Sequence, residues 1–243
     1  MHNKKFISLA SSPGKTGQYF YTSFFNYHNI DAIYTPYKTS NLKQSVSNAI
    51  DDGIDGISIT MPFKHSVIPL LDSTDESVDL YQSCNTIKIV NGKLYGYNCD
   101  LEGVKHVSKQ IYLNDRISIL GDGAIGLMFA NYLNSYNFQV FSRHTNWVDR
   151  IAETDVLINC TPCGTTAQNR LFEFLPLGTR LVIDMSMVTK NYLADQCRIS
   201  NIQYVSGREF YKQQFLKQFE IYTGIIPQPD VYDRFSEKFY QSI

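Results

Sequence analysis

This sequence has little net charge and no long apolar run. Its 22 basic and 23 acidic side chains leave a formal net charge of -1 over 243 residues, which gives no electrostatic case for nucleic acid or an acidic membrane as a partner. No segment is long and apolar enough for a membrane span, and the start of the chain lacks the apolar run of a signal peptide. We therefore expect a cytoplasmic globular protein with one large domain or two.

The cysteines and histidines are too scattered in the sequence for a disulfide framework or a zinc site. Five cysteines at irregular spacing do not make a disulfide framework. Cys160 and Cys163 form a C-x-x-C pair, but no second pair or histidine cluster completes a zinc site. A redox pair, moreover, normally opens a helix after the first strand of its fold. We expect no metal and no chemistry at these cysteines.

The chain does have a glycine pattern. Ile117–Leu120 is apolar enough for a buried strand, and it runs into Gly121-x-Gly123-x-x-Gly126 and then into the helix-like LMFANYLNSY. Strand, glycine turn and helix in this order are typical of a dinucleotide-binding site, although the glycines alone also occur in ordinary turns. Gly121 allows the tight turn, Gly123 lets the backbone approach a pyrophosphate, and Gly126 lets helix and strand pack. The phosphates would lie on free N–H groups at the helix start.

The next strand lacks the carboxylate that an NAD site uses. Phe138–Phe141 ends roughly 20 residues beyond the glycines, where this fold contacts the adenosine ribose. Ser142, Arg143 and His144 follow it, with Arg150 further on. An arginine there favours a 2′-phosphate and therefore NADP, unless Arg143 is a solvated surface charge. The missing acid also counts against an S-adenosylmethionine methyltransferase, which needs a carboxylate for both ribose hydroxyls.

The first hundred residues form an α/β unit of their own. Strands and helices alternate there, and Asn91-Gly92 is typical of a hairpin turn. The expected strands are Phe6–Leu9, Ala32–Pro36, Gly56–Thr60, Asn85–Val90 and Lys93–Tyr97, and the expected helices are Tyr19–His28, Leu42–Asp52, Pro69–Leu71, Glu76–Tyr81 and one that begins at Leu101. A dinucleotide does not need this unit, so we expect it to hold a substrate.

Short runs throughout the chain resemble those of the shikimate dehydrogenases. GISITMPFK (Gly56–Lys64), SCNTI (Ser83–Ile87) and GYNCDLEG (Gly96–Gly103) are similar in order and spacing to the family's G-x-N-V-T-x-P-x-K, A-x-N-T and G-x-N-T-D-x-x-G. SRH (Ser142–His144), NCTPCG (Asn159–Gly164) and Gly207–Gly224 resemble the family's NADP-reading Asn-Arg-Thr, its Asn-Ala-Thr-x-x-Gly and its closing segment. The chain is identified as a divergent member of that family.

The resemblance implies a two-domain α/β fold. Residues 1–100 would bind the substrate, completed by residues 212–243 with a C-terminal helix that returns to the first domain, and residues 101–211 would form a Rossmann-type NADP-binding domain. It also implies reversible hydride transfer between NADP(H) and 3-dehydroshikimate/shikimate or a closely related cyclic polyol acid, in the chorismate pathway of aromatic amino acid biosynthesis. The partner would be a small molecule, with no nucleic acid and no membrane, and the protein a monomer or a homodimer.

Two ionisable residues fit the proton chemistry of such a reaction. Oxidation of a secondary alcohol by a nicotinamide needs one proton acceptor beside the carbinol, and a lysine serves when burial or nearby charge lowers its pKa. Lys64 follows a strand end and Asp100 precedes a helix, and an α/β sheet presents ligands at such loop ends. By themselves they are typical of a surface charge and a helix N-cap. The resemblance makes them the family's catalytic Lys–Asp pair.

The resemblance extends to residues that contact substrate and cofactor. Thr60, Asn85 and Gln214 would hold the ring hydroxyls of the substrate, because amides and hydroxyls both donate and accept. The expected cofactor-binding residues are Gly121, Gly123, Ala124, Ile125, Gly126, Ser142, Arg143, His144, Thr161 and Gly207.

The end of the site that binds the substrate carboxylate departs from the family. Where the family has Ser-x-Ser, an ungapped alignment brings in Lys15-Thr16-Gly17, and a gapped one Ser11 and Ser12. Ser58 replaces the family's asparagine, and the tyrosine that follows Asp184-Met185 in the family is absent. Lys15 could bind a carboxylate through one charged contact, or the substrate differs, as quinate or aminoshikimate would. A second hypothesis is a paralogue that senses a ligand or cofactor without chemistry; retention of the Lys–Asp pair counts against it.

Overall fold

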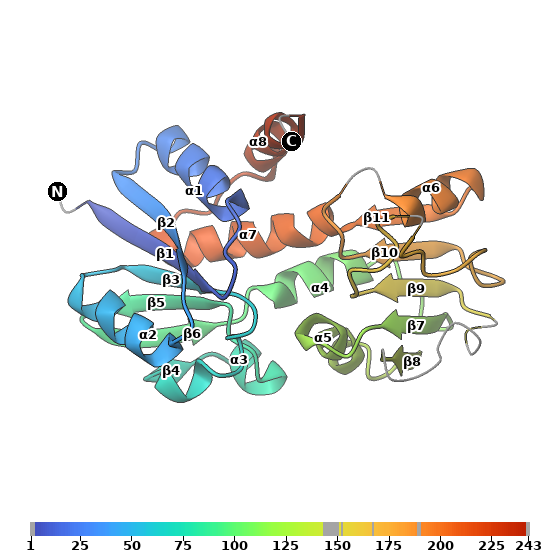
Figure 1. The fold of residues 1–243 in the computed structure, drawn as a ribbon, viewed down its shortest axis with the longest axis horizontal. Coiled ribbons are helices and arrows are strands. Elements are labelled where there is room, and N and C mark those ends of the chain that lie inside the picture. Colours follow the sequence, from blue (N-terminus) through green and yellow to red (C-terminus); the bar gives the residue numbers. More distant parts are fainter. Residues whose placement is uncertain (1–2, 143–150, 152, 167, 189–190, 242–243) are drawn as a thin grey trace. The chain divides into compact units, whose positions relative to one another are not determined.

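A computed structural model describes residues 3–142, 151, 153–166, 168–188 and 191–241 of the chain. The chain divides into two compact units, a first unit of Met1–Cys99 with Gln214–Ile243 and a second unit of Asp100–Gln213 (Figure 1). Each unit contains its own β-sheet. The predicted two-domain α/β fold is confirmed, including the C-terminal helix that returns to the first unit.

The sheet of the first unit is mixed. Its strands lie in the order β2 (Ala32–Lys38), β1 (Lys4–Ala10), β3 (Gly56–Ile59), β5 (Thr86–Val90), β6 (Lys93–Tyr97) and β4 (Ser73–Thr74). Strands β2, β1 and β3 are parallel, whereas β5 runs antiparallel to both β3 and β6. Asn91 and Gly92 join β5 to β6 with φ angles of 51° and 75°, the left-handed backbone that a two-residue hairpin turn requires.

Helices cover both faces of this sheet, and strand alternation assigns neighbouring side chains to opposite faces. Phe6 packs with α1 (Thr16–Tyr27), α8 (Pro229–Gln241) and the later turns of α7 (Gly207–Thr223). Its neighbour Ile7 packs with α2 (Leu42–Asp51), α3 (Glu76–Tyr81) and the 3-10 helix η1 (Ile68–Leu70).

The face that carries α1 and α7 is rich in aromatic rings. Phe6 stacks on Tyr222 with ring centroids 4.9 Å apart, and Tyr21 stacks on Tyr34 at 4.3 Å. Such pairs contribute about 0.5–1.5 kcal/mol each beyond the area that they bury. This packing fixes α7 against β1 and β3, and therefore fixes where the polar side chains of α7 lie.

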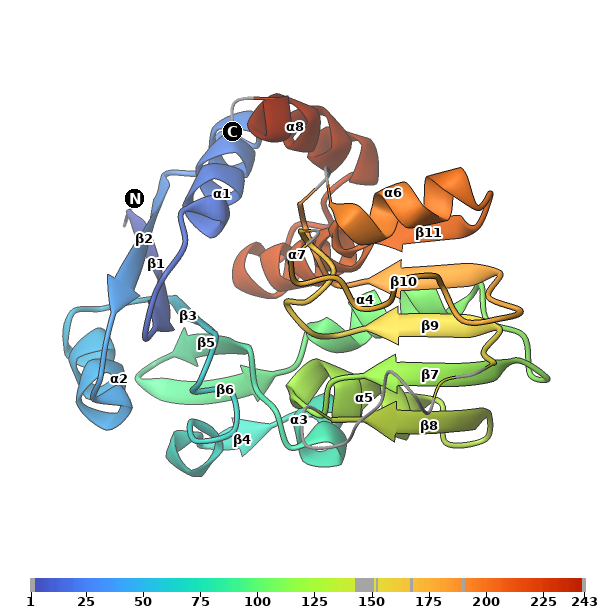
Figure 2. The ribbon, with the colours of Figure 1, turned by 45° about the vertical axis from the view of Figure 1, so that its right-hand side comes forward.

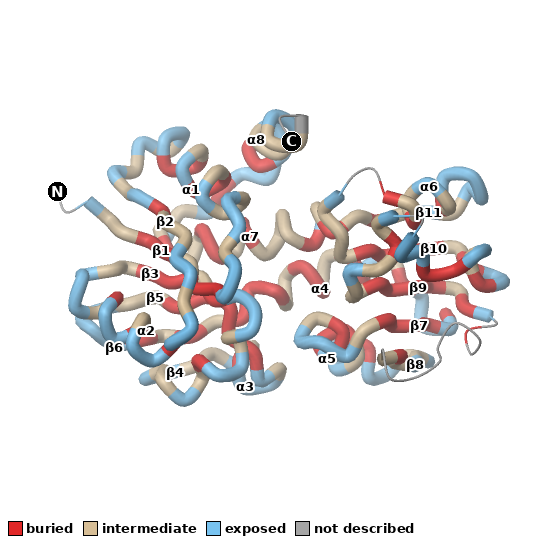
Figure 3. The backbone as a smooth tube through the Cα atoms, viewed as in Figure 1, coloured by how far each residue is buried: buried red, intermediate tan, exposed pale blue. Residues whose placement is uncertain are grey.

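The sheet of the second unit is parallel throughout. Its strands lie in the order β11 (Gln203–Ser206), β10 (Leu181–Asp184), β9 (Val156–Asn159), β7 (Arg116–Leu120) and β8 (Asn137–Phe141), and their carboxyl ends share one edge (Figure 2). Strands β9 and β10 are buried along their whole length (Figure 3), as suits continuous apolar runs at the centre of a parallel sheet. The unit also contains α4 (Asp100–Ser108), α5 (Ala124–Tyr132), α6 (Tyr192–Ile199) and the start of α7.

The strand order reverses beside β7. The chain passes from β7 to β8 on one side and then to β9 on the other side of β7. In open α/β sheets a ligand-binding crevice lies at the carboxyl ends of the strands at such a point. The glycine pattern that follows β7 and the NCTPCG run at the end of β9 both lie there.

The helix after the glycine pattern begins earlier than its residues predict. Helix α5 starts at Ala124, inside the glycine pattern, and ends at Tyr132. The N–H of Leu127 donates to the carbonyl of Gly123 at 2.9 Å, so helical hydrogen bonding begins within the turn. The helix therefore presents its first N–H groups, at Ala124 and Ile125, directly beside that turn.

Candidate functional site

The glycine turn after β7 is closed by backbone contacts that side chains would block. Gly121 has a φ of 100°, which favours glycine. A Cβ atom on Gly126 would lie 1.9 Å from the carbonyl oxygen of Gly121, so the first turn of α5 packs directly on the strand end. A Cβ atom on Gly123 would meet no heavy atom within 4 Å. The space beside Gly123 is therefore open, as close approach of a pyrophosphate requires.

The start of α5 offers N–H groups to an anion. No side chain caps this helix, and the N–H groups of Ala124, Ile125 and Gly126 precede the first internal hydrogen bond of the helix. A helix N-terminus attracts negative charge because its backbone dipoles add. These residues fit the diphosphate of a dinucleotide.

Thr161 lies against the same turn. A Cβ atom on Gly121 would be 3.2 Å from both the carbonyl oxygen of Cys160 and Cγ2 of Thr161, so the loop after β9 contacts the glycine turn. Asn159 shapes that loop, because its Oδ1 accepts from the N–H of Thr161 at 3.1 Å and from the Thr161 hydroxyl at 2.7 Å. Predicted cofactor residues from β7 and β9 thus meet at one edge of the sheet.

Sequence reasoning missed a buried carboxyl group at the end of β10. Asp184 is 1% exposed. Its oxygens accept from Asn159 Nδ2 at 3.0 Å, from Asn191 Nδ2 at 3.2 Å and from the Tyr204 hydroxyl at 2.7 Å. Burial raises the pKa of Asp184, and these hydrogen bonds oppose that rise. The network ties the ends of β9 and β10 to β11 next to the loop that carries Thr161.

Gly207 starts α7 in close contact with the end of β10. Its N–H donates to the carbonyl of Ser186 at 3.0 Å. A Cβ atom on Gly207 would lie 2.5 Å from the carbonyl oxygen of Met185, so a larger residue would push the helix start away from the strand. Gly207 is therefore required by packing within the second unit, whatever its relation to a cofactor.

Ser142 adjoins the glycine turn from the other side. It follows Phe141, whose carbonyl accepts from the N–H of Gly121 at 2.7 Å. Arg143 and His144, which we expect to contact the adenosine ribose, lie outside the described residues. The structure accordingly brings together the predicted residues at β7, at β9 and up to Ser142.

In the first unit, Thr60, Lys64 and Asn85 lie at the edge where β1 and β3 end. The N–H of Ile59 donates to the carbonyl of Asn85 at 2.8 Å, and the N–H of Cys84 donates to the carbonyl of Lys64 at 2.8 Å. The loop after β3 is therefore fastened to the residues before β5. Thr60 is exposed, Lys64 is half-buried and Asn85 is 3% exposed. The structure brings these three predicted residues together.

Lys15 lies in the loop after β1. It is exposed and precedes α1, and its side chain does not cap that helix. The N–H of Ser11, at the start of the same loop, donates to the carbonyl of Met61 at 3.3 Å. This bond joins the loop to the one that carries Thr60 and Lys64, so the first loop belongs to the same edge of the sheet.

Asp100 is the first residue of α4 and of the second unit. It is 1% exposed. A carboxylate suits a helix start, because the first N–H groups carry partial positive charge. The residue before it, Cys99, belongs to the first unit, and its N–H donates to Oδ1 of Asn85 at 2.9 Å. The chain therefore passes to Asp100 directly from the backbone that holds Asn85.

Sequence reasoning selected Gln214 of α7 and missed Gln218, one turn later on the same helix face. Gln214 is half-buried, whereas Gln218 is 3% exposed. Gln218 Nε2 donates to the carbonyl of Asn85 at 3.2 Å and to Oγ1 of Thr86 at 2.6 Å, and its Oε1 accepts from the Tyr21 hydroxyl at 2.7 Å. The available signal was a second amide four residues after Gln214, next to Phe219.

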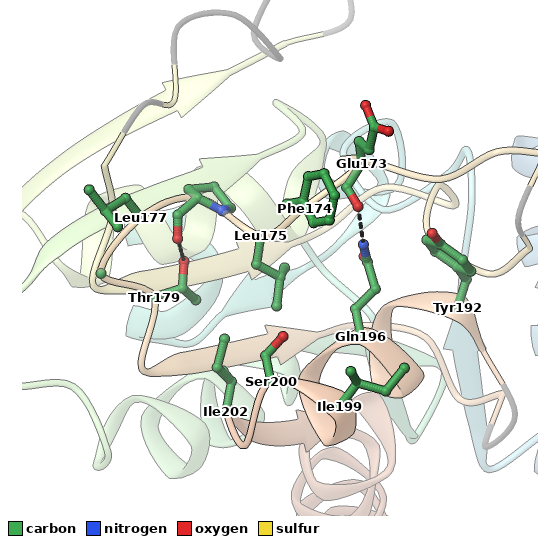
Figure 4. A pocket seen from close by; sticks show the side chains of 12 residues that line it. Glu173, Phe174, Leu175, Leu177, Thr179, Tyr192, Gln196, Ile199, Ser200 and Ile202 are labelled. Atoms are coloured by element: carbon green, nitrogen blue, oxygen red, sulfur yellow. Dashed lines mark hydrogen bonds between the residues drawn. The ribbon is translucent and has the colours of Figure 1, made fainter.

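The second unit also contains a cavity of about 410 Å³ (Figure 4). Exposed apolar side chains such as Phe174, Leu177 and Ile199 line it. Gln196 donates across it to the carbonyl of Glu173 at 3.1 Å. No residue predicted to bind substrate or cofactor is among those that line it, so this cavity is separate from the candidate site.

The cysteines that drew attention in the sequence are unpaired with one another in the part of the chain that the structure describes. Cys160 and Cys163 are free thiols, and burial raises the pKa of Cys160. Within the described ranges, no group of three or more His, Cys, Asp or Glu side chains could hold a metal ion. Nor is any described helix long and apolar enough to cross a membrane.

Comparisons with known proteins point in one direction. Residues 10–87 match a model of the shikimate dehydrogenase substrate binding domain. The chain is 30% identical over 189 residues to the shikimate biosynthesis protein AroDE of Chlamydia muridarum; the match covers 69% of this chain but 38% of that relative's length. It is 25% identical over 247 residues to a shikimate dehydrogenase (NADP(+)) of Methanosphaera stadtmanae, covering 85% of this chain and 86% of the relative.

A solved structure shows the same fold. Shikimate 5-dehydrogenase of Thermus thermophilus, in complex with NADP(H) and shikimate, is similar with a TM-score of 0.79. The match covers 97% of this chain and 99% of that chain at 18% identity. At this identity the likeness concerns the fold alone, and the chemistry has to be argued from the residues.

Proposed function

Because the chain belongs to the shikimate dehydrogenase family, we propose that it is an NADP-dependent oxidoreductase that acts on 3-dehydroshikimate/shikimate or a closely related cyclic polyol acid. The observation that carries this proposal is the meeting of Thr60, Lys64 and Asn85 at one strand edge of the first unit. A lysine on the same strand edge as a threonine and an asparagine can take a proton from an alcohol whose neighbouring hydroxyls are held. The relative from Methanosphaera stadtmanae carries NADP(+) in its name, and the glycine turn of this chain fits the same cofactor.

The second unit supplies the cofactor contacts. NADP, when bound, supplies the nicotinamide carbon that takes up or releases the hydride. The turn from Gly121 to Gly126 and the start of α5 hold the diphosphate through backbone N–H groups, and Thr161 adjoins them. Arg143, with Ser142 and His144 beside it, holds the 2′-phosphate.

Lys64 moves the proton. During oxidation the hydride leaves the carbinol carbon, the hydroxyl proton passes to Nζ of Lys64, and the carbon–oxygen bond becomes a carbonyl; reduction reverses each step. Asp100, the other member of the family's Lys–Asp pair, orients the Lys64 side chain. A general base of this kind accounts for about 10²–10⁴ in rate.

Three polar side chains hold the ring hydroxyls, and the carboxylate end is rebuilt. Thr60, Asn85 and Gln214 contact the hydroxyls, and Lys15 meets the carboxylate through one charged contact. Ser58, at the position of the family's asparagine, lies within 3.3 Å of Gln218 Oε1, to which its hydroxyl donates. The Ser58 hydroxyl is therefore bound to α7, and the substrate lacks the contact that the family's asparagine makes.

Nicotinamide absorbance tests the proposal. Purified protein is mixed with NADP or NAD and with shikimate, quinate or aminoshikimate in turn, in both directions of reaction. We expect reduction of NADP with shikimate, and slower reduction of NAD. Turnover with quinate alone, or with aminoshikimate alone, would assign that compound as the substrate in place of shikimate. Binding of NADP without turnover of any of the three would favour a protein that senses its ligand.

A further inference from the structure

Two buried amide side chains in the first unit have orientations that the backbone dictates. Oδ1 of Asn85 accepts from the N–H of Cys99 at 2.9 Å, and because a backbone N–H can only donate, the atom facing it is the oxygen. Nε2 of Gln218 donates to the carbonyl of Asn85 at 3.2 Å, and because a carbonyl can only accept, the atom facing it is the nitrogen. Turning over either amide would place two donors or two acceptors face to face.

Thr86 connects the two amides. Its Oγ1 lies 2.6 Å from Nε2 of Gln218 and 2.7 Å from Oδ1 of Asn85. Since Gln218 donates, the Thr86 hydroxyl accepts on that side and directs its own proton to Asn85 Oδ1, which lies nearer at 2.7 Å than Cys99 Sγ at 3.2 Å. The Tyr21 hydroxyl donates to Oε1 of Gln218 at 2.7 Å, so the donors run in one direction from Tyr21 to Asn85. All four side chains are 3% exposed or less, and buried hydrogen bonds of this kind are costly to break.

The hydrogen bonds that run from Tyr21 to Asn85 end at a side-chain nitrogen without a partner among the described residues. Among the residues that the structure describes, none forms a hydrogen bond with Nδ2 of Asn85, although the atom is buried. A buried donor left unpaired costs stability and calls for an explanation. The nitrogen belongs to the residue that shares a strand edge with Thr60 and Lys64. A fixed, unsatisfied donor at that edge is suited to an incoming acceptor.

We infer that Gln218 is a positioning residue that, through Thr86, holds the Asn85 amide with its NH₂ group toward the substrate. The inference rests on the proposed function and specifies whether one substrate subsite binds a hydrogen-bond acceptor or a donor. The Asn85 subsite takes an oxygen that can accept, such as the lone pair of a ring hydroxyl or of a carbonyl. It discriminates against a group that only donates, such as a ring ammonium, because two donors would then face each other.

Gln218→Met tests the inference. Methionine keeps the length of the side chain among the aromatic rings and removes both the donor and the acceptor. The Thr86 hydroxyl can then point elsewhere, which leaves the N–H of Cys99 as the one remaining group that holds the oxygen of the Asn85 amide. We expect KM for shikimate to rise about tenfold, with a smaller change in kcat and an unchanged Kd for NADP. An unchanged KM in folded Gln218→Met protein would overturn the inference.

Thr223→Val is the matched control on the same helix. The Thr223 hydroxyl donates to the carbonyl of Phe219 at 2.7 Å and accepts from the N–H of Ile225 at 3.1 Å, so the variant also loses side-chain hydrogen bonds of α7. Neither bond involves Asn85, Thr86 or Gln218, and we expect an unchanged KM. A rise in KM equal to that of Gln218→Met would assign the effect to α7 as a whole and overturn the inference.

A second readout needs no turnover. The side-chain NH₂ resonances of Asn85, identified by their loss in Asn85→Ala, report the amide directly in protein without ligand. We expect a sharp pair in wild-type and Thr223→Val protein and a broadened or shifted pair in Gln218→Met; the same sharp pair in all three would overturn the positioning role. If wild-type protein turns over no cyclic polyol acid while the pair still depends on Gln218, the proposed function fails and the positioning role stands.

Discussion

Two buried asparagines, Asn85 in the first unit and Asn159 in the second, make the same kinds of hydrogen bond through the side-chain oxygen. They differ in the hydrogen bonds of the side-chain nitrogen. Through Oδ1, each accepts one hydrogen bond from a backbone N–H and one from a threonine hydroxyl. Nδ2 of Asn159 donates to the carbonyl of Cys163 at 2.9 Å and to Asp184 at 3.0 Å. Nδ2 of Asn85 has no partner among the described residues.

The difference separates an amide that completes the fold from one that the fold holds ready for a ligand. The hydrogen bonds of Asn159 close on Asp184, a buried carboxyl group that needs donors around it. Those of Asn85 are neutral and stop at a buried donor without a partner among the described residues. We therefore expect changes at Asn159 to lower stability and changes at Asn85 to lower activity.

Replacing each asparagine by alanine should give the largest difference between the two sites. Asn159→Ala loses four hydrogen bonds and leaves a buried carboxyl oxygen short of a donor, so we expect the free energy of unfolding to fall by about 3 kcal/mol. Asn85→Ala loses two side-chain hydrogen bonds but also an unpaired donor, and should cost about 1 kcal/mol. Its kcat/KM for shikimate should fall about a hundredfold or more. Urea unfolding and steady-state kinetics measure both; a larger stability loss in Asn85→Ala would contradict the comparison.

Asp184→Asn tests whether the closed network contains a buried charge. Burial raises the pKa of Asp184 above 3.8, so the folded carboxyl binds a proton more readily than the unfolded one. Wild-type protein should therefore gain stability relative to Asp184→Asn as pH falls from neutral toward about 3.8. Unfolding free energies of both proteins across this range give the difference, from which the other carboxyl groups cancel. Parallel stability curves would show that Asp184 titrates alike in both states.

His28 offers a smaller test, because it has an unpaired buried nitrogen away from the strand edge. Its Nε2 has no partner among the described residues, and the ring packs between Phe24 and Phe219. Burial lowers the pKa of His28 below 6.5, so its contribution to stability is present above pH 6.5 and is lost as pH falls below it. His28→Gln should remove this part of the pH dependence and leave kcat/KM for shikimate unchanged. A loss of activity would contradict this expectation and show that His28, like Asn85, contributes to the reaction.

Local chemistry accounts for what the sequence could predict. The turn from Gly121 to Gly126 needs one left-handed residue and one position without a Cβ, and the Asn91-Gly92 hairpin needs two left-handed residues. These requirements involve neighbours in the chain, so spacing alone indicates them. The fold and the meeting of Thr60, Lys64 and Asn85 follow from motifs of the same kind.

Distant contacts could not be predicted in this way. Gln218 is separated from Asn85 by 133 positions, and their contact depends on how the aromatic rings of α7 and α1 pack. Asp184 ends an apolar strand, and its burial depends on Asn191 and Tyr204 reaching it from later elements. Polar groups satisfied by remote partners leave no regular spacing in the sequence, which is why both residues were missed.

Lys64 provides the most direct test of the chemistry. Initial rates of NADP reduction by shikimate are measured for wild-type protein and Lys64→Ala, together with the Kd for NADP of each. We predict turnover by the wild-type protein, a kcat about a hundredfold or more lower in Lys64→Ala, and the same Kd for NADP in both. A variant that keeps most of its kcat, or a wild-type protein that binds NADP and reduces none of it with shikimate, would contradict the proposed reaction.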